Sequence, residues 1–258
     1  MIPNKEELNK LVEKYEVPVF IEKDPVQFPH KYIKQADIEV SGLISACFAY
    51  GSRPKIIETL TYLHEVFNGN PSEFVLNFDI DRDAEIFKGF IYRYDTEKEL
   101  VLLLHIIGKA LKDFGTLEKA FLQGYNPDDK NLKQSLTNFV NLLRSYLPCD
   151  EITCGSLFRL LPSPEKGSAC KRLNLFLKWM IRKPPVDLHI WKNIPASKLI
   201  IPLDTHVGRI SRKWKLTERK SDDWKTAEEI TEKLKEFDAI DPVKYDFAIF
   251  GQGISGLA

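Results

Sequence analysis

The pattern of apolar and polar positions along this chain is that of amphipathic helices. Residues 96–115 show it most clearly, because apolar side chains recur there at intervals of one to four positions, at Leu100, Leu103, Leu104, Ile107 and Leu111. Thr96 and Glu99 have the spacing of a capping box at the start of this segment. The segment therefore predicts one long helix with a single buried face.

Other segments carry helix signals of the same kind, at residues 37–51, 53–69, 128–147 and 241–253. Asp37 is a candidate cap for the first of them, and Pro54 suits the first turn of the second. Few stretches alternate as a strand would. We therefore predict an all-α protein of roughly a dozen helices, organised as a single domain over residues 1–258.

The composition is that of a water-soluble globular protein, with 43% hydrophobic and 29% charged residues in a chain of 258. No apolar run reaches the roughly 18 residues of a membrane span. The first ten residues are polar and lack the apolar core of a signal peptide. We therefore expect a cytoplasmic protein with no membrane partner.

The four cysteines are Cys47, Cys149, Cys154 and Cys170. Their spacing fits neither a disulfide framework nor a CxxC zinc motif. A metal held by Cys149, Cys154 and the distant His206 is conceivable, but buried free thiols account for cysteines of this kind more simply. We expect no metal.

The net charge is zero, yet the charges are unevenly distributed along the chain. Residues 166–220 contain 14 Lys and Arg against 3 Asp and Glu, which gives +11, so the remainder carries −11. Such a basic segment fits a polyanionic partner. Internal pairing of these cations with the acidic remainder is an equally good interpretation of the charge alone.

Residues 157–182 predict two helices joined by a turn, in a helix-hairpin-helix arrangement. The turn runs from Pro162 to Ser168, and the second helix starts at about Ala169. Amide groups in such a turn, and the helix N-terminus after it, can bind a DNA phosphate. The second helix is apolar on most sides and has one polar stripe, formed by Lys171, Asn174, Lys178 and Arg182. The stripe either lines a groove or is a solvated edge.

Lys171 and Asp204 are the candidate catalytic pair. An ordinary lysine is protonated at neutral pH, and the neighbouring Arg172 together with a closed site would favour the free amine. An amine of this kind can attack an acetal-like carbon and form a Schiff base, while a nearby carboxylate stabilises the developing positive charge. On a nucleoside, this chemistry breaks the bond between base and sugar. Asp204 could equally serve only to cap the helix that follows it.

The segment PLDTHVGRI, residues 202–210, resembles the Asp-Thr-His motif of the helix-hairpin-helix DNA glycosylases. Lys171 in GSACKRLNLFL occupies the place of their catalytic lysine, and the long hairpin is most similar to that of the archaeal 8-oxoguanine glycosylase branch. Most of the chain, from SGLISACFAYGSR to DPVKYDFAIFGQGISG, also resembles a bacterial family of unknown function. The glycosylase resemblance implies two helical lobes with a cleft between them, and a hairpin and catalytic segment at about residues 154–215.

By position, the resemblance implies that Lys171 is the Schiff-base nucleophile and Asp204 the transition-state carboxylate. It implies DNA contacts around the hairpin and the basic helix face, at Ser163, Lys166, Gly167, Ser168, Arg172 and Lys178. His206 and Arg209 match the motif and are expected to serve packing and helix structure. The cysteines that hold an iron–sulfur cluster in the endonuclease III branch are missing from this sequence, so we expect no cluster and no other cofactor.

The leading hypothesis is a monomeric DNA repair glycosylase with an associated β-lyase activity, acting on an oxidised purine such as 8-oxoguanine in damaged duplex DNA. One alternative is a nucleic-acid-binding protein of the same fold without the chemistry. Another is a related enzyme that breaks the N-glycosidic bond in RNA or in free nucleosides. The presence of both Lys171 and Asp204 favours the first, because a pure binding protein has no need of the pair.

Overall fold

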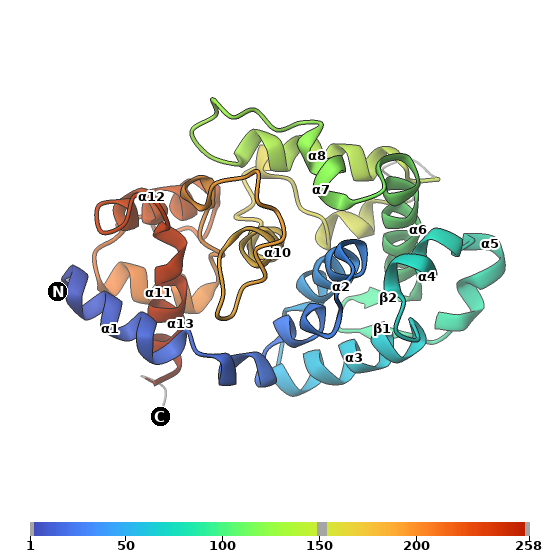
Figure 1. Ribbon diagram of the computed structural model, residues 1–258, viewed down its shortest axis with the longest axis horizontal. Helices are drawn as coiled ribbons and strands as arrows, with labels where there is room; N and C mark the ends of the chain where they lie inside the picture. The colour runs from blue at the N-terminus through green and yellow to red at the C-terminus, as the bar shows by residue number, and fades with distance from the viewer. Residues whose placement is uncertain (1–2, 149–153, 256–258) are drawn as a thin grey trace. The chain divides into compact units, whose positions relative to one another are not determined.

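The computed structural model describes residues 3–148 and 154–255, the last three by their backbone alone, and in them the chain is mainly helical, as predicted (Figure 1). Within the domain expected over residues 1–258, the chain divides into two compact units. The terminal unit comprises Met1–Lys23, Asp128–Lys133 and Pro164–Ala258, and the central unit comprises Asp24–Pro127 and Gln134–Ser163. No helix in the described part of the chain is long and apolar enough to cross a membrane.

The central unit is built around two helices, α2 (Gln35–Phe48) and α6 (Glu97–Phe114). The other helices of this unit are α3 (Arg53–Val66), α4 (Pro71–Asn77), α5 (Ile80–Asp83), α7 (Leu117–Leu122) and α8 (Lys133–Ser145). Short 3-10 turns complete it, at Pro25–Gln27, Pro29–Lys31, Ala84–Phe87 and Gly155–Arg159. Helix α2 is buried from Asp37 to Phe48, which explains why its sequence has no polar face.

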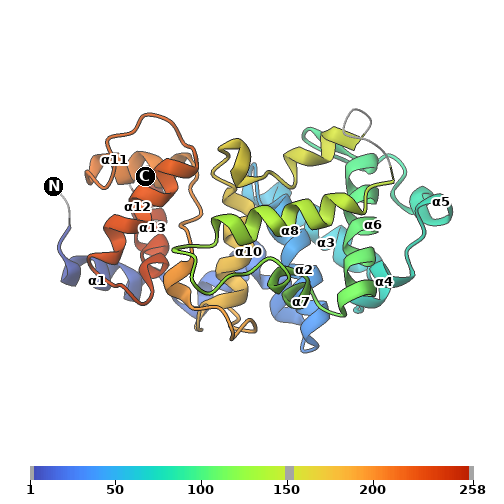
Figure 2. The same cartoon turned by 90° about the horizontal axis from the view of Figure 1, so that it is seen from above.

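Helix α6 confirms the strongest prediction from the sequence. All five residues of its apolar face are at most 2% exposed, and Thr96 and Glu99 form the capping box. Helix α4 lies beside α6 in both views (Figure 2). Gly108 makes this approach possible, because a Cβ at that position would lie 2.1 Å from the carbonyl oxygen of Val75.

Asp37 does not cap its own helix, which starts two residues earlier at Gln35. Its carboxylate instead accepts a hydrogen bond of 2.8 Å from the amide of Ser72, in the first turn of α4. The prediction was wrong because a carboxylate near one helix start can equally satisfy the free amides of a neighbouring helix. Glu39 does the same for α7, since it accepts hydrogen bonds from the amides of Leu117 and Glu118.

The central unit also contains a small antiparallel hairpin formed by β1 (Ile91–Tyr92) and β2 (Asp95–Thr96). Ile91 pairs with Thr96 and Tyr92 pairs with Asp95, so Arg93 and Tyr94 form the turn. The sequence pattern did not predict this hairpin, because two residues per strand are too few to show alternation.

The terminal unit joins the two ends of the chain. It contains α1 (Lys5–Tyr15), α10 (Lys171–Ile181), α11 (Thr205–Lys213), α12 (Trp224–Lys235) and α13 (Asp246–Ser255), with short 3-10 turns at Pro18–Lys23, Pro164–Lys166, Ala196–Lys198 and Pro242–Tyr245. Helix α13 packs against both α1 and α11 (Figure 1). Gly251 allows the contact with α1, because a Cβ there would lie 2.4 Å from the ring of Tyr15.

Candidate functional site

Lys171 is the first residue of α10, as the sequence predicts. Cys170 precedes it as the N-cap, with a φ of 47°, a left-handed conformation that is costly for a residue other than glycine. The amide of Cys170 donates to the Ser168 hydroxyl oxygen at 3.2 Å, which fixes the turn that leads into the helix. Lys171 and Arg172 are both half-buried.

The turn before α10 is held to the start of α12. Gly167 accepts a hydrogen bond of 3.0 Å from the amide of Trp224, and its own amide donates to the carbonyl of Pro164. Ser168 forms a β-bridge with Asp223. Lys166 and Gly167 remain exposed, and Ser168 is half-buried, so these three members of the predicted phosphate-binding turn lie at the surface of the terminal unit.

Ser163 differs from Lys166, Gly167 and Ser168, because it is only 4% exposed. A side chain buried to this extent cannot reach an external phosphate in this conformation. Ser163 is therefore not accessible for the DNA contact that the sequence predicted. The sequence misled because serine in a Pro/Ser/Gly turn is usually solvated.

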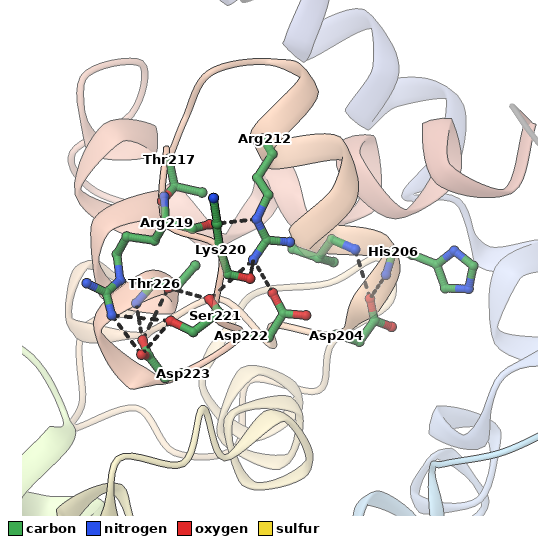
Figure 3. A network of polar contacts seen from close by, with 11 residues as sticks. Asp204, His206, Arg212, Thr217, Arg219, Lys220, Ser221, Asp222, Asp223 and Thr226 are labelled. Atoms are coloured by element: carbon green, nitrogen blue, oxygen red, sulfur yellow. Dashed lines mark hydrogen bonds and ion pairs between the residues drawn. The ribbon is translucent and has the colours of Figure 1, made fainter.

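Asp204 is the N-cap of α11. Its Oδ1 atom accepts hydrogen bonds from the amides of His206 at 2.9 Å and Val207 at 2.8 Å. Figure 3 shows that both bonds reach the same oxygen, while the second oxygen points away from the two amides. The capping interpretation is confirmed, and capping leaves Oδ2 available for a second task.

The other two motif residues lie on α11 without joining Asp204. The imidazole of His206 is half-buried and directed away from the Asp204 carboxylate (Figure 3). Arg209 is exposed, so the predicted packing role belongs to Val207 and Ile210, which are 1% and 5% exposed.

Lys178 is not a DNA contact in this structure. It is 2% exposed, and its Nζ lies 3.3 Å from the carboxylate of Asp246 and 3.7 Å from that of Asp187. The ring of Phe247 lies under the same ammonium, at 3.7 Å. Asn174 and Arg182 are also buried, so beyond the half-buried Lys171 the polar stripe neither lines an open groove nor forms a solvated edge. The sequence pattern did not reveal this burial, because three of the carboxylates that pair with Lys178 and Arg182, at Glu16, Asp241 and Asp246, are distant along the chain.

Arg182 extends the same ion cluster, because it shares Asp187 with Lys178. Its guanidinium donates to Glu16 at 2.8 Å, to Asp241 at 2.9 Å and also to Asp187. Although burial opposes the charged form, these three carboxylates keep the pKa of Arg182 above its ordinary value. The cluster ties the residue after α1 and the residue before Pro242 to the end of α10.

Asp246 links α10 electrostatically to α11. Burial raises the pKa of this carboxyl above its ordinary value, Lys178 opposes the shift, and the negative charge of Asp204 adds to it. Asp246 therefore interacts with both Lys178 of α10 and the capping carboxylate of α11. No sequence motif marked Asp246, because its partners are distant along the chain.

The loop between α11 and α12 is a network of internally paired cations (Figure 3). Arg212 donates to the carboxylate of Asp222 at 2.5 Å and to the carbonyls of Arg219, Lys220 and Ser221. Gly208 leaves room for this pair, because a Cβ there would lie 2.6 Å from Oδ1 of Asp222 and 3.0 Å from Nη1 of Arg212. The absence of a side chain at Gly208, the glycine of the PLDTHVGRI motif, is therefore explained by the space that the Arg212–Asp222 pair needs.

Arg219 forms a second pair in the same loop. It donates to the Asp223 carboxylate at 2.7 Å and to the Thr226 hydroxyl at 2.9 Å. Although desolvation opposes ionisation, hydrogen bonds from Ser221, Thr226 and Arg219 keep the pKa of Asp223 below its ordinary range. Asp223 also caps α12 by accepting from the Thr226 amide.

Internal pairing accounts for several cations of the basic segment. Lys178, Arg182, Arg212 and Arg219 pair with carboxylates of the terminal unit. The exposed cations of the segment are Lys166, Lys183, Lys192, Arg209, Lys213, Lys215 and Lys220. These seven residues, and not the buried Lys178 and Arg182, are the fully exposed cations of the segment.

The cysteines differ from the expectation in one respect. Cys154 is disulfide-bonded, whereas Cys47 and Cys170 are free and buried. Cys149, which together with Cys154 and His206 made up the candidate metal site, lies outside the described residues. Among the residues that the structure describes, no group of three or more His, Cys, Asp or Glu could hold a metal ion.

The fold and this site together define a helical protein whose terminal unit carries a lysine at one helix start and a capping carboxylate at another. The chain belongs to the family described as protein of unknown function (DUF2400), whose model matches residues 24–255. No curated protein and no solved structure matched the chain. The family brings no function with it, so the resemblance to the helix-hairpin-helix glycosylases stays a prediction.

Proposed function

We propose that the protein is a DNA glycosylase with an associated β-lyase activity, in which Lys171 is the nucleophile and Asp204 stabilises the transition state. The observation that carries the proposal is the link through Asp246. This buried carboxyl pairs with Lys178, two turns after Lys171 on α10, and interacts with the charge of Asp204 at the start of α11. The Asp246 carboxyl is thus attracted by Lys178 of α10 and repelled by the carboxylate that caps α11.

The proposed reaction uses the free amine of Lys171 as a nucleophile. The amine attacks C1′ of the nucleotide, the bond from C1′ to the base nitrogen breaks, and the base leaves with that electron pair and takes up a proton. Opening of the C1′–O4′ bond, with a proton transferred to O4′, gives the Schiff base. Loss of a C2′ proton then expels the 3′ phosphate, and water releases the lysine.

Asp204 contributes through the oxygen that capping leaves available. Positive charge develops on C1′ and O4′ as the base departs, and a nearby carboxylate lowers the energy of that state. An oxidised purine such as 8-oxoguanine is the proposed substrate class, on the strength of the motif resemblance. The exposed cations of residues 166–220 would hold the phosphates of the strand.

Borohydride trapping tests this function, because the reagent reduces a Schiff base to a stable covalent adduct. The wild type would be incubated with duplexes that contain 8-oxoguanine, uracil, hypoxanthine or an abasic site. We expect an adduct on the 8-oxoguanine duplex that Lys171→Gln abolishes and the control Lys225→Gln retains, since Lys225 is an exposed lysine of the same unit outside residues 166–220. Trapping by Lys171→Gln would refute the assignment. Binding without any adduct would favour a nucleic-acid-binding protein that lacks the chemistry.

A further inference from the structure

The β1–β2 hairpin of the central unit presents large side chains to solvent. Tyr94 is 71% exposed and Ile91 is 68% exposed. Arg93, between them, is exposed as well. We refer to these three residues as the hairpin tip. Exposed apolar groups on a loop are common, so the question is whether the tip is held in place.

The inward face of the hairpin is anchored firmly. Tyr92 is 1% exposed, its hydroxyl donates to the carbonyl of Tyr50, and the two rings meet edge to face at 5.0 Å. Asp95, which is 2% exposed, accepts from the Tyr50 hydroxyl. Arg159 donates to the carbonyl of Tyr94 at 2.6 Å and to Asp95 at 3.2 Å. The tip is therefore preorganised, which lowers the entropy cost of binding a partner.

Arg93 has a conformation that its residue type does not favour. Its φ is 56°, in the left-handed region where glycine is the usual occupant of a hairpin turn. The guanidinium lies 5.6 Å from the ring centres of both Tyr50 and Tyr94. Gly51 makes room for it, because a Cβ there would lie 2.9 Å from Nη1 of Arg93. Position 93 thus carries an arginine, although glycine would adopt this left-handed backbone conformation at a lower energy cost.

The charge at the tip is positive. In the described part of the chain, no carboxylate lies within ion-pair distance of Arg93. The charge of the buried Asp95 is balanced by Arg159, which is itself 49% exposed. Glu97, the nearest exposed acid along the chain, accepts from the amide of Gly89 at 2.6 Å. The guanidinium of Arg93 therefore lies over the exposed ring of Tyr94, and that of Arg159 binds the backbone carbonyl of the same residue.

We propose that the hairpin tip is a stacking surface for an unpaired base of a single-stranded nucleic acid. A base stacks on an aromatic ring irrespective of its sequence, and neighbouring arginines attract the phosphates beside it. An exposed ring on an anchored backbone and a neighbouring guanidinium meet both needs. This binding requires none of the chemistry proposed for Lys171, so either proposal can fail alone.

The test measures binding of a short single-stranded oligonucleotide that contains 2-aminopurine, whose fluorescence falls when the base stacks. We expect Tyr94→Ala to weaken binding roughly fivefold to 100-fold and to restore the fluorescence, whereas Tyr94→Phe retains both. Arg93→Gln should lower the dependence of log affinity on log salt by about 0.7, the loss of one phosphate contact on a single strand. Melting temperature would confirm that each variant is folded.

Matched controls come from the same unit. Tyr62 is 39% exposed and its ring stacks on Phe90, and Lys112 is an exposed cation near the end of α6. Tyr62→Ala and Lys112→Gln should bind as the wild type does. The proposal is overturned if Tyr94→Ala binds like Tyr62→Ala, or if its only defect is in association with another protein. Lys171→Gln should bind the oligonucleotide normally even where it loses trapping, which separates the two proposals.

Discussion

Nζ of Lys178 lies 3.3 Å from the carboxylate of Asp246, and both side chains are buried between helices α10 and α13. Asp187 shares the same ammonium at 3.7 Å. Lys178 is thus the cation beside Asp246 inside the terminal unit, whereas Asp187 also pairs with Arg182. Removing one member of a buried ion pair leaves its partners charged in a poor solvent, which costs more than the pair itself contributes.

Lys178→Met should therefore lower the free energy of unfolding by about 3–5 kcal/mol, because Asp246 loses its cation, whereas Asp187 keeps its ion pair with Arg182. Urea denaturation followed by circular dichroism measures this change. The double variant Lys178→Met/Asp246→Leu should recover a part of the loss, since it removes the orphaned charge together with its partner. Equal stability of Lys178→Met and the wild type would show that the pair is solvated.

Local sequence signals predicted the features that neighbouring residues determine. The apolar face of α6, its capping box, the start of α10 near Lys171 and the cap at Asp204 all depend on residues within a few positions of one another. The tertiary pairings were not predictable in this way. Asp37 caps α4 and not its own helix, and the cations of α10 pair with Asp187, Asp241 and Asp246. A charged residue looks the same in the sequence whether its partner is water or a distant carboxylate.

His64 should make the stability of the central unit depend on pH. Its Nδ1 donates to the carbonyl of Leu60 at 2.7 Å and its Nε2 accepts from the Ser41 hydroxyl at 2.8 Å, so the buried ring is neutral. Burial lowers the pKa of His64 from 6.5 to about 4. Between these values the unfolded chain binds a proton that the folded chain does not, so stability is complete above pH 6.5 and falls as the pH drops towards 4.

The expected loss from this titration is about 3 kcal/mol, at about 1.4 kcal/mol for each pKa unit. Urea denaturation at a series of pH values would measure it. His64→Gln should remove this component of the pH dependence, whereas His30→Gln, at an exposed position, should preserve it. An identical pH dependence in His64→Gln and the wild type would contradict the assignment.

Gly208→Ala tests the steric reason for the motif glycine. Alanine in a helix is ordinarily more stable than glycine by about 1 kcal/mol. Here the new methyl group would meet Asp222 at 2.6 Å and displace its ion pair with Arg212. We therefore expect no gain from Gly208→Ala in the wild type, but a gain of about 1 kcal/mol in an Asp222→Ala background. The same gain in both backgrounds, measured by urea denaturation, would show that the contact is unimportant.

Variants of Asp204 separate its two tasks. Asparagine caps a helix about as well as aspartate, so Asp204→Asn should change the free energy of unfolding by only a few tenths of a kcal/mol. Asp204→Ala loses the hydrogen bonds to the amides of His206 and Val207, and should cost about 1 kcal/mol. If the second oxygen stabilises developing positive charge, both variants should lose base release, because neither has a carboxylate.

Thr116→Ala provides the matched control for capping. Thr116 caps α7 by accepting from the amide of Lys119, and it lies in the central unit. Its replacement should cost about as much stability as Asp204→Ala and leave base release unchanged. Unfolding free energies and single-turnover release of the base would be measured for all three variants. Normal release by Asp204→Asn would mean that capping is the sole task of Asp204, and the nucleophile would then lack its proposed carboxylate partner.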